Sequence, residues 1–339
     1  MFVVGWLVAC SSSPEPATPT AATGTPEVPE PTATTATTGG PTADTQDPGP
    51  VCRAAGDYDE TIEVDGRPFR YRLHVPPTGA EPRAAILQLH GGGSDGAAIE
   101  TVTGLSALGD QEGFATLTPE GFAVGKGGPQ VWNAGSCCGP PALLPDHVAS
   151  MIAMIDDAQT KGACLDADRI FATGHSNGGM MSYRLACEAS DRIAAVAISA
   201  GTLATVEESV DPPLVAFECT PSRPVPLLHV HGLEDLCVPY DGAVASNGQD
   251  RLGVEAAVEV FRTAASCPDE PTDETEGVVR TRTWTCPQDI EIALVTVEEL
   301  GHPWAGSPIY GNPEQCGGTT TDAISTTTEA WAFFERHGR

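Results

Sequence analysis

Arg169–Glu188 reads RIFATGHSNGGMMSYRLACE. The apolar run before the glycines is typical of a buried strand, and the pattern after them is typical of a helix. Between them, residues 174–178 (GHSNG) match G-x-S-x-G, in which a serine occupies a sharp turn from a strand into a helix. Such a short motif arises by chance in a glycine-rich chain, so its meaning depends on its surroundings. Here strand and helix signals flank the motif, and we predict that Ser176 projects from the edge of a sheet.

Strand and helix patterns alternate along the rest of the chain. Glu60–Val75 alternates apolar and polar residues around Asp65 and Gly66, which predicts an antiparallel hairpin. Further strands are predicted at 84–89, 114–117, 169–173, 193–199, 226–230 and 290–297, and helices at 147–161, 180–188, 252–265 and 326–337. Repeated strand–helix units predict an α/β domain with a mostly parallel sheet and helices on both faces. We expect residues 51–339 to form this one domain.

The chain is strongly acidic, because 17 lysines and arginines stand against 46 aspartates and glutamates. Such a charge repels phosphate backbones and anionic lipid surfaces. We therefore expect no nucleic-acid partner, whereas a neutral ester, sugar or polyester meets no electrostatic barrier. Acidity that serves solubility alone explains the same composition.

The first fifty residues differ in composition from the rest. Met1–Cys10 is an apolar run, and residues 11–50 are mostly Pro, Thr, Ala, Gly and acid, which cannot bury a core. Leu7–Cys10, followed by three serines, resembles the lipobox of bacterial lipoproteins. This resemblance implies a signal segment at 1–10, a lipid anchor on Cys10 and a disordered spacer at 11–50. No lysine or arginine precedes the run, so an ordinary cleaved signal and a chance apolar start are the alternatives.

Cysteines are frequent in this chain. Eleven are present, and setting Cys10 aside leaves ten, an even number that favours disulfides over reduced core thiols. We expect Cys267 and Cys286 to pair, because they bracket a polar excursion. The neighbours Cys137 and Cys138 are expected to bond to two different partners rather than to each other. Together with the N-terminus, this indicates an extracytoplasmic protein.

A serine in such a turn needs a base, and four histidines follow Ser176 in the chain. His302 lies in a loop just after the apolar run IEIALVTV, where it can reach the edge of the sheet. His229 and His231 lie within or at the end of the strand LLHVHG, and His337 is third from the C-terminus. His302 is therefore the candidate base.

The serine also needs an acid that orients the histidine, and this acid precedes the histidine in the chain. The loop after LLHVHG offers Glu234, Asp235 and Asp241, between which spacing alone does not choose. Asp269 and Glu270 also follow the serine, but they lie in an acid-rich loop after a helix, which favours a solvated surface.

A third component follows another predicted strand. Residues 89–93 read LHGGG, and glycines there let the backbone approach a substrate oxygen and donate N–H groups to it. Backbone near Gly92 and the amide of Asn177, the residue after the serine, are the candidate oxyanion hole. A glycine-rich surface turn is the alternative.

Long motifs then reveal a family resemblance. The chain from about Asp57 to His337 resembles bacterial secreted esterases related to polyhydroxybutyrate depolymerases and feruloyl esterases. The resemblance is carried by LHGGG (89–93), VWNAGSCCG (131–139), GHSNGGMMSYRLACE (174–188), HVHGLEDLCVPY (229–240) and GHPWAG (301–306). It implies the α/β-hydrolase fold, with Ser176 as nucleophile, Asp235 as acid and His302 as base.

The same resemblance places Trp132 and Trp304 in loops around the mouth of the site, where flat aromatic faces suit acyl chains, aryl esters or sugars. Core packing of these side chains is the alternative. The chain departs from the family at Ala305, where proline is usual, and at Cys237, which interrupts the acid loop. Both departures leave the loop geometry near the site open.

We therefore predict a secreted serine esterase, expected to be a monomer, that meets the membrane only through its lipid anchor. Its substrate is a small ester or a polymer: a hydroxyalkanoate, a feruloyl sugar ester or an acetyl sugar ester. His229 and His231 share one strand face as metal ligands do, but no third ligand follows at a recognisable spacing. We expect no metal and no organic cofactor. A serine peptidase of the same fold and a non-catalytic surface binding protein are the alternatives.

Overall fold

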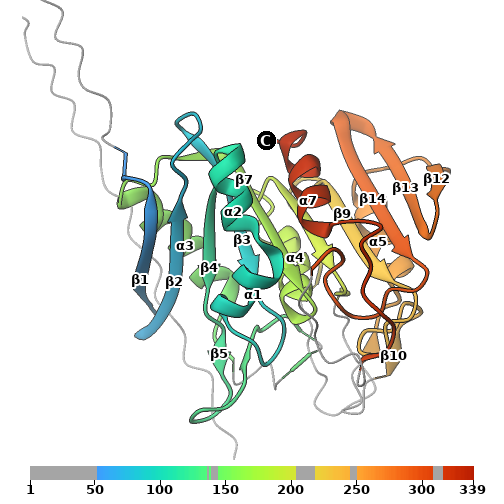
Figure 1. The fold of residues 1–339 in the computed structure, drawn as a ribbon, viewed down its shortest axis with the longest axis horizontal. Coiled ribbons are helices and arrows are strands. Elements are labelled where there is room, and N and C mark those ends of the chain that lie inside the picture. The colour runs from blue at the N-terminus through green and yellow to red at the C-terminus, as the bar shows by residue number, and fades with distance from the viewer. Residues whose placement is uncertain (1–51, 136, 139–143, 204–217, 245–249, 308–315) are drawn as a thin grey trace, which may run out of the picture. The chain divides into compact units, whose positions relative to one another are not determined.

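The computed structural model describes residues 52–135, 137–138, 144–203, 218–244, 250–307 and 316–339. These residues belong to one compact unit that spans residues 48–339. The predicted signal segment with Cys10 and nearly all of the predicted spacer belong to another unit, and both lie outside the described residues. Figure 1 shows a central sheet with helices on either side of it.

Ten strands form this sheet, in the order β1-β2-β4-β3-β7-β8-β9-β14-β13-β12. The six strands from β4 to β14 pair in parallel, and the two strands at each edge pair antiparallel. Their bounds are β1 (Gly56–Val64), β2 (Arg67–Val75), β3 (Arg83–Leu89), β4 (Ala115–Pro119), β7 (Leu165–His175), β8 (Ala195–Ser199), β9 (Leu227–Gly232), β12 (Thr272–Glu276), β13 (Val279–Cys286) and β14 (Ile290–Val297). This order confirms the predicted mostly parallel sheet with an antiparallel hairpin at its start.

Helices cover both faces of the sheet. Leu185 on one side packs into a core with Leu87, and Phe334 on the other side packs into a second core with Ile86. The first core is covered by α3 (His147–Thr160), α4 (Asn177–Glu188) and α5 (Val254–Ala264), and α1 (Gly96–Thr103), α2 (Leu105–Glu112) and α7 (Thr326–Glu335) lie on the opposite face (Figure 1). Short strand pairs, β5 (Phe122–Ala123) with β6 (Gln130–Val131) and β10 (Ala243–Val244) with β11 (Asp250–Arg251), lie outside the main sheet.

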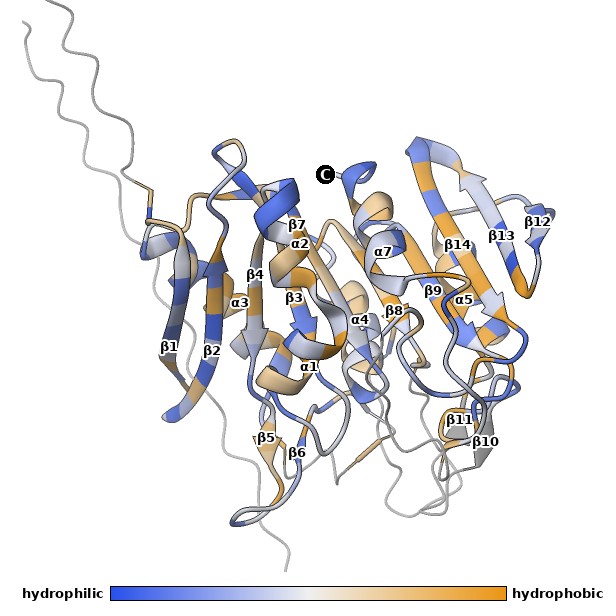
Figure 2. Cartoon of the chain, viewed as in Figure 1, coloured by the Kyte–Doolittle hydropathy of each residue, from blue (hydrophilic) through white to orange (hydrophobic). Residues whose placement is uncertain are grey.

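β3 shows how a central strand serves both cores. Ala85, Leu87 and Leu89 face one core, Ala84 and Ile86 face the other, and all seven residues of the strand are buried. Because side chains alternate along a strand, a strand buried on both faces is mostly apolar, and in β3 only Arg83 and Gln88 are polar. In Figure 2 the edge strand β1 is largely hydrophilic, whereas β9 and β14 are largely hydrophobic. The apolar runs in the sequence therefore mark the centre of the sheet.

The polar excursion between Cys267 and Cys286 is not a loop. It forms the hairpin β12–β13, which extends the sheet at its edge. Its strands face solvent, and the exposed pair Arg280–Asp273 bridges them across the register. Trp284 is the one large aromatic residue of this hairpin that is buried. The hairpin therefore lacks the alternation of apolar and polar residues that would predict its strands.

Five disulfides connect the described cysteines: Cys52–Cys164, Cys137–Cys138, Cys187–Cys219, Cys237–Cys316 and Cys267–Cys286. The predicted pair Cys267–Cys286 is confirmed. The expectation that Cys137 and Cys138 bond to different partners is wrong, because they bond to each other. The other eight described cysteines pair among themselves, so no thiol is left for either neighbour, and a left-handed backbone at Cys138 (φ 73°) accompanies the turn.

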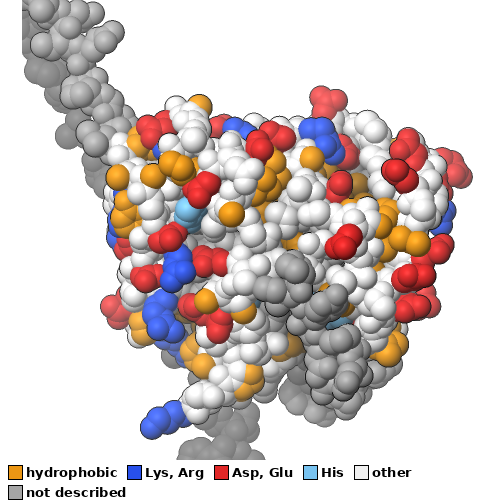
Figure 3. Space-filling model, in the orientation of Figure 1, with side chains coloured by type: hydrophobic (Ala, Val, Ile, Leu, Met, Phe, Trp, Pro, Cys, Tyr) orange, Lys and Arg blue, Asp and Glu red, His pale blue; other side chains and the backbone are white. Residues whose placement is uncertain are grey.

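These disulfides indicate that the domain folds in an oxidising, extracytoplasmic compartment. Within the described residues, no helix combines the length and the apolar character that a membrane crossing requires. Acidic side chains are spread over the face shown in Figure 3, as the composition implies.

Candidate active site

Ser176 lies at the junction of β7 and α4, in a strained backbone conformation (φ 55°, ψ −118°). Its backbone N–H donates to the carbonyl of Ser199 on the next strand at 2.9 Å. A Cβ on Gly178 would overlap the carbonyl oxygen of Leu89, and a Cβ on Gly174 would overlap Gly178 itself. Both glycines of the motif are thus required by close backbone packing, and the turn holds the serine at the carboxyl end of β7.

His302 and Asp235 meet at the same edge. Asp235 follows β9 and His302 follows β14, and these parallel neighbours end side by side. The distance between His302 Nδ1 and Asp235 Oδ2 is 2.7 Å. The ring of His302 also lies 4.7 Å from the ring of His175, the residue before Ser176, so Asp235, His302 and the turn that carries the serine gather at one place.

The buried carboxylate of Asp235 is held from several sides. Its Oδ1 accepts the backbone N–H groups of Cys237 and Val238, each at 2.8 Å. Burial acts to raise the pKa of Asp235, but the hydrogen bond and the charge of His302, followed by smaller effects that include the N–H of Val238, outweigh it, and the pKa lies below its usual value. Asp235 is therefore ionised at neutral pH and able to orient the imidazole.

Among the acids that the sequence left open, only Asp235 contacts His302. Glu234 and Asp241 are exposed in the same loop. Asp269 and Glu270 are exposed between α5 and β12, as a solvated surface requires.

The glycine loop after β3 lies against the serine turn. A Cβ on Gly91 would lie 3.6 Å from Ser176 Cβ, and one on Gly92 would lie 3.5 Å from Asn177 Cβ. His90 Nε2 accepts the N–H of Gly121 at 3.0 Å, so its Nδ1 carries the proton and donates to the Gly91 carbonyl at 2.8 Å. The structure thus brings the predicted oxyanion residues Gly92 and Asn177 together.

The two predicted substrate-binding tryptophans are core residues. Trp132 and Trp304 are each 1% exposed. The indole of Trp132 donates to the His90 carbonyl at 2.7 Å, and that of Trp304 donates to Thr327 Oγ1 at 3.0 Å. Neither presents a face to a ligand, so the structure agrees with core packing, the alternative reading.

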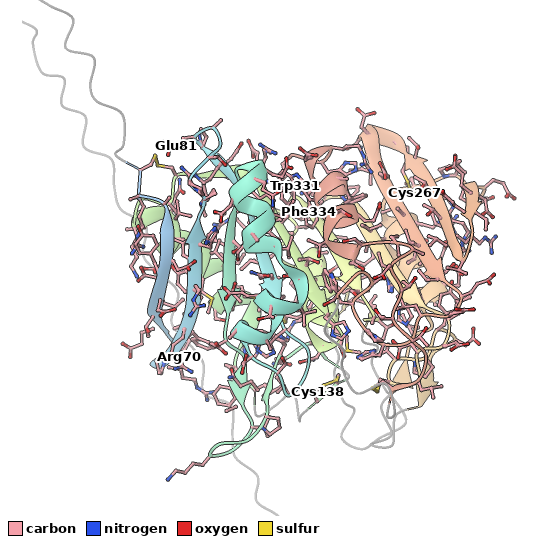
Figure 4. The ribbon with its side chains drawn as sticks, in the orientation of Figure 1. Arg70, Glu81, Cys138, Cys267, Trp331 and Phe334 are labelled. Atoms are coloured by element: carbon pink, nitrogen blue, oxygen red, sulfur yellow. A yellow bond between two sulfur atoms is a disulfide. The ribbon has the colours of Figure 1, made fainter. Side chains whose placement is uncertain are left out.

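Cys138 lies over the glycine loop instead. A Cβ on Gly92 would lie 2.7 Å from Cys138 Sγ, and Cys138 is exposed at the edge of the sheet that carries the site, where Figure 4 labels it. The sequence signal for this feature is the pair of adjacent cysteines in VWNAGSCCG, for which the strain of a ring between neighbours predicts two separate bridges.

Two buried histidines near the site make contacts that the sequence did not reveal. Among the described residues, no third side chain joins His229 and His231 to form a group that could hold a metal ion. The two rings are hydrogen-bonded to each other, to the hydroxyl of Tyr183 and to the carbonyl of Val238. Within the described part of the chain, the one group of metal-ligand type is Cys52, Glu81 and Cys164, and its two cysteines form a disulfide. The histidine bonds depend on tertiary contacts that no local pattern encodes.

Fold and site together define an α/β-hydrolase. A serine turn at the carboxyl end of a central parallel strand, with a histidine and an acid from later strands at the same edge, is the arrangement of that class. A family model described as phospholipase/carboxylesterase matches residues 141–251.

Comparison with known proteins narrows the class. The chain is 31% identical over 307 residues, 84% of either chain, to NocK of Nocardia uniformis subsp. tsuyamanensis, which is named as a candidate esterase. It is 33% identical over 187 residues to feruloyl esterase B of Piromyces equi, covering 53% of this chain and 33% of that one. Acetyl xylan esterase from Aspergillus awamori has the same fold, with a TM-score of 0.55 at 15% identity over 77% of this chain and 97% of the other. The chain belongs to this family of α/β-hydrolase esterases, and the resemblance to feruloyl esterases is confirmed.

Proposed function

We propose that the protein is a serine esterase that hydrolyses carboxylic esters through an acyl-enzyme, with Ser176, His302 and Asp235 as its triad. The observation that carries the proposal is the 2.7 Å bond between His302 Nδ1 and Asp235 Oδ2, at the carboxyl ends of the strands where Ser176 also lies. Because Asp235 accepts a hydrogen bond from Nδ1–H, the proton of the neutral ring is on Nδ1. The other ring nitrogen, Nε2, then has a free lone pair that can accept a proton.

In the proposed reaction, Ser176 Oγ attacks the ester carbonyl while its proton passes to His302 Nε2. The carbonyl oxygen becomes an oxyanion and is held by backbone N–H groups near Gly92 and Asn177. His302 then returns the proton to the leaving alcohol, and the acyl group stays on the serine. Water, deprotonated by the same ring, releases the acid and restores Ser176. Every proton in this cycle is carried by the protein's own side chains.

A fluorophosphonate probe tests the proposal directly. It reacts with a serine that is activated by its histidine, so we expect one label per molecule, on a peptide that contains Ser176. The Ser176→Ala variant is expected to take up no label. An unlabelled wild-type protein, or a label elsewhere, would contradict the proposed function.

For the substrate we infer an ester with an apolar or aromatic part, of the feruloyl or acetyl sugar type. Two of the related proteins are named feruloyl esterase and acetyl xylan esterase. Among the described residues, the exposed large apolar side chains are Leu233 and Leu236, on either side of Asp235 in the sequence. Turnover of methyl ferulate, p-nitrophenyl acetate and hydroxybutyrate oligomers should be compared. Hydrolysis of the hydroxybutyrate oligomers alone would contradict the inferred class and favour a polyester depolymerase.

We also propose that residues 51–339 are the catalytic domain of a secreted lipoprotein anchored through Cys10. The five disulfides and the lipobox-like start support this location. Metabolic labelling with a fatty acid, compared between the wild type and Cys10→Ser, tests it. Equal labelling of the two proteins would overturn the anchor.

A further inference from the structure

We propose that His231 and His175 are positioning residues of the esterase: each donates its Nε2 proton to a backbone carbonyl of the loop that carries the acid or the base. This inference rests on the proposed function, because it concerns the geometry of the same triad. It assigns a role to two histidines that the reaction itself does not use.

His231 is hydrogen-bonded to the loop that carries Asp235. The ring is fully buried in β9, and its Nε2 lies 2.8 Å from the carbonyl oxygen of Val238. Because a carbonyl only accepts, Nε2 must carry the proton. Val238 is also one of the residues whose N–H holds the carboxylate of Asp235, and His231 Nε2 lies 3.5 Å from the other carboxylate oxygen, Oδ2. The ring therefore ties down the turn that places the acid.

A buried chain of hydrogen bonds fixes the direction of this ring. With the proton on Nε2, the Nδ1 of His231 accepts from His229 Nε2 at 2.9 Å. His229 Nδ1 is then the acceptor for the hydroxyl of Tyr183 at 2.6 Å. The chain thus runs one way, from Tyr183 on α4 to the acid loop, and every donor in it has an acceptor.

Burial keeps the members of this chain neutral. Tyr183, His229 and His231 are each 0% exposed. Burial lowers the pKa of both histidines and raises the pKa of Tyr183. No solvent competes for these bonds, and a buried polar chain that is fully satisfied is rigid.

His175 does the same for the base loop. Its Nε2 lies 2.7 Å from the backbone carbonyl oxygen of His302, which again only accepts. Burial, together with the nearby His302, lowers the pKa of His175 to about 4, so the ring donates as a neutral imidazole. Since His175 precedes Ser176, this bond joins the nucleophile's turn to the loop of the base.

Loss of either bond should act on the chemical step more than on substrate binding. The fully buried ring of His231 is shielded from the substrate, and both rings set where the acid and the base stand. A misplacement of about 1 Å in a catalytic group costs on the order of 10²-fold in rate. We therefore expect kcat to fall while KM stays nearly constant.

The test compares leucine and glutamine at His231. His231→Leu removes the donor, and we expect kcat on p-nitrophenyl acetate to fall about 10- to 100-fold. His231→Gln carries both an N–H donor and an acceptor oxygen and should restore most of the loss. His337→Leu is the matched control, because His337 is also buried but lies far from the site. It contacts Glu291 near the start of β14, whereas the site lies at the carboxyl ends of the strands. A loss of kcat in His231→Leu no larger than in His337→Leu, or no rescue by glutamine, overturns the proposal.

A second readout reports on the acid–base pair itself. A histidine N–H that donates to a carboxylate gives a far-downfield proton NMR signal, here from His302 Nδ1–H. We expect this signal to shift or broaden in His231→Leu and to persist in His337→Leu. An unchanged signal in His231→Leu contradicts a positioning role.

His175 gives an independent arm should His231→Leu fail to fold. His175→Phe removes the donor to His302, and His175→Gln keeps one. We expect phenylalanine to slow fluorophosphonate labelling of Ser176 at least about tenfold and glutamine to restore it. Equal labelling rates in the two variants overturn the role of His175. An unlabelled wild type would instead mean that the proposed esterase function fails, so the two failures are distinguishable.

Discussion

Asp235 is the proposed acid of the triad, and two exposed acids in the same loop serve as controls. Asp235→Asn keeps the shape but removes the charge that orients and stabilises His302. We expect kcat to fall by about 10³- to 10⁴-fold. Glu234→Gln and Asp241→Asn change exposed acids in the same loop and should stay within about twofold of the wild type. Steady-state hydrolysis of p-nitrophenyl acetate measures all three.

A larger loss in Glu234→Gln than in Asp235→Asn would reassign the acid and break the proposed triad. Among single residues of the site, the sequence predicted Ser176 and His302 from their order in the chain and from their places after apolar runs. Spacing did not separate Asp235 from Glu234, because adjacent residues differ only in which one the loop turns inward, and the choice of Asp235 came from the family resemblance alone. The hydrogen bonds of His175 and His231 were also out of reach, since their acceptors lie 127 and 7 residues away in the chain.

The strand–turn–helix element around Ser176 depends on glycines that leave no room for a side chain. Gly178→Ala should force the first turn of α4 away from the carbonyl of Leu89. We expect a loss of about 1–3 kcal/mol in the free energy of unfolding, as for an overpacked core, together with a loss of labelling at Ser176. Gly338→Ala is the control, because a Cβ there would meet only ordinary contacts at 3.6 Å. Urea unfolding measures both variants, and equal midpoints would refute the packing argument.

The disulfide Cys267–Cys286 staples the edge hairpin β12–β13 at its base. Its cysteines are 19 residues apart. Closing a loop of that length lowers the entropy of the unfolded chain, which stabilises the folded state by about 3 kcal/mol. Replacing both cysteines by serine should lower the free energy of unfolding by roughly this amount. Esterase activity should persist, because the hairpin lies apart from Ser176 in the order of the strands. A variant as stable as the wild type would show that the hairpin is held by its strand pairing alone.

The elements that the sequence predicted and those that it missed differ in burial. β3, β8, β9 and β14 are largely buried on both faces and were predicted close to their observed bounds. The hairpin β12–β13 and the eight-residue helices α1 and α2 were not predicted. β12 is exposed and β13 is mostly half-buried, and the helices are short and separated at Gly104, so neither carries a long apolar period.

At the scale of the whole molecule, buried neutral histidines make stability depend on pH. Burial lowers the pKa of His147 to about 3 and that of His175 to about 4, and it also lowers the pKa of His90, His229 and His231. In the unfolded chain these rings titrate near pH 6.5, so between about pH 6.5 and 4 the unfolded state binds more protons than the folded state. The free energy of unfolding should therefore be greatest above about pH 6.5 and fall as the pH decreases.

Each such histidine contributes up to about 1.4 kcal/mol per pH unit in this window, so several together give a steep loss. Urea unfolding at pH 7, 6 and 5 measures the slope. His147→Gln removes one of these groups, a ring that accepts the N–H of Asn133, and should reduce the slope by up to about 1.4 kcal/mol per pH unit. Paired carboxylates such as Asp235 lose their contribution only at lower pH, because their pKa values lie below the usual range. A free energy of unfolding that is flat between pH 7 and 5 would mean that the folded and unfolded states take up protons alike, contrary to the lowered pKa values of these rings.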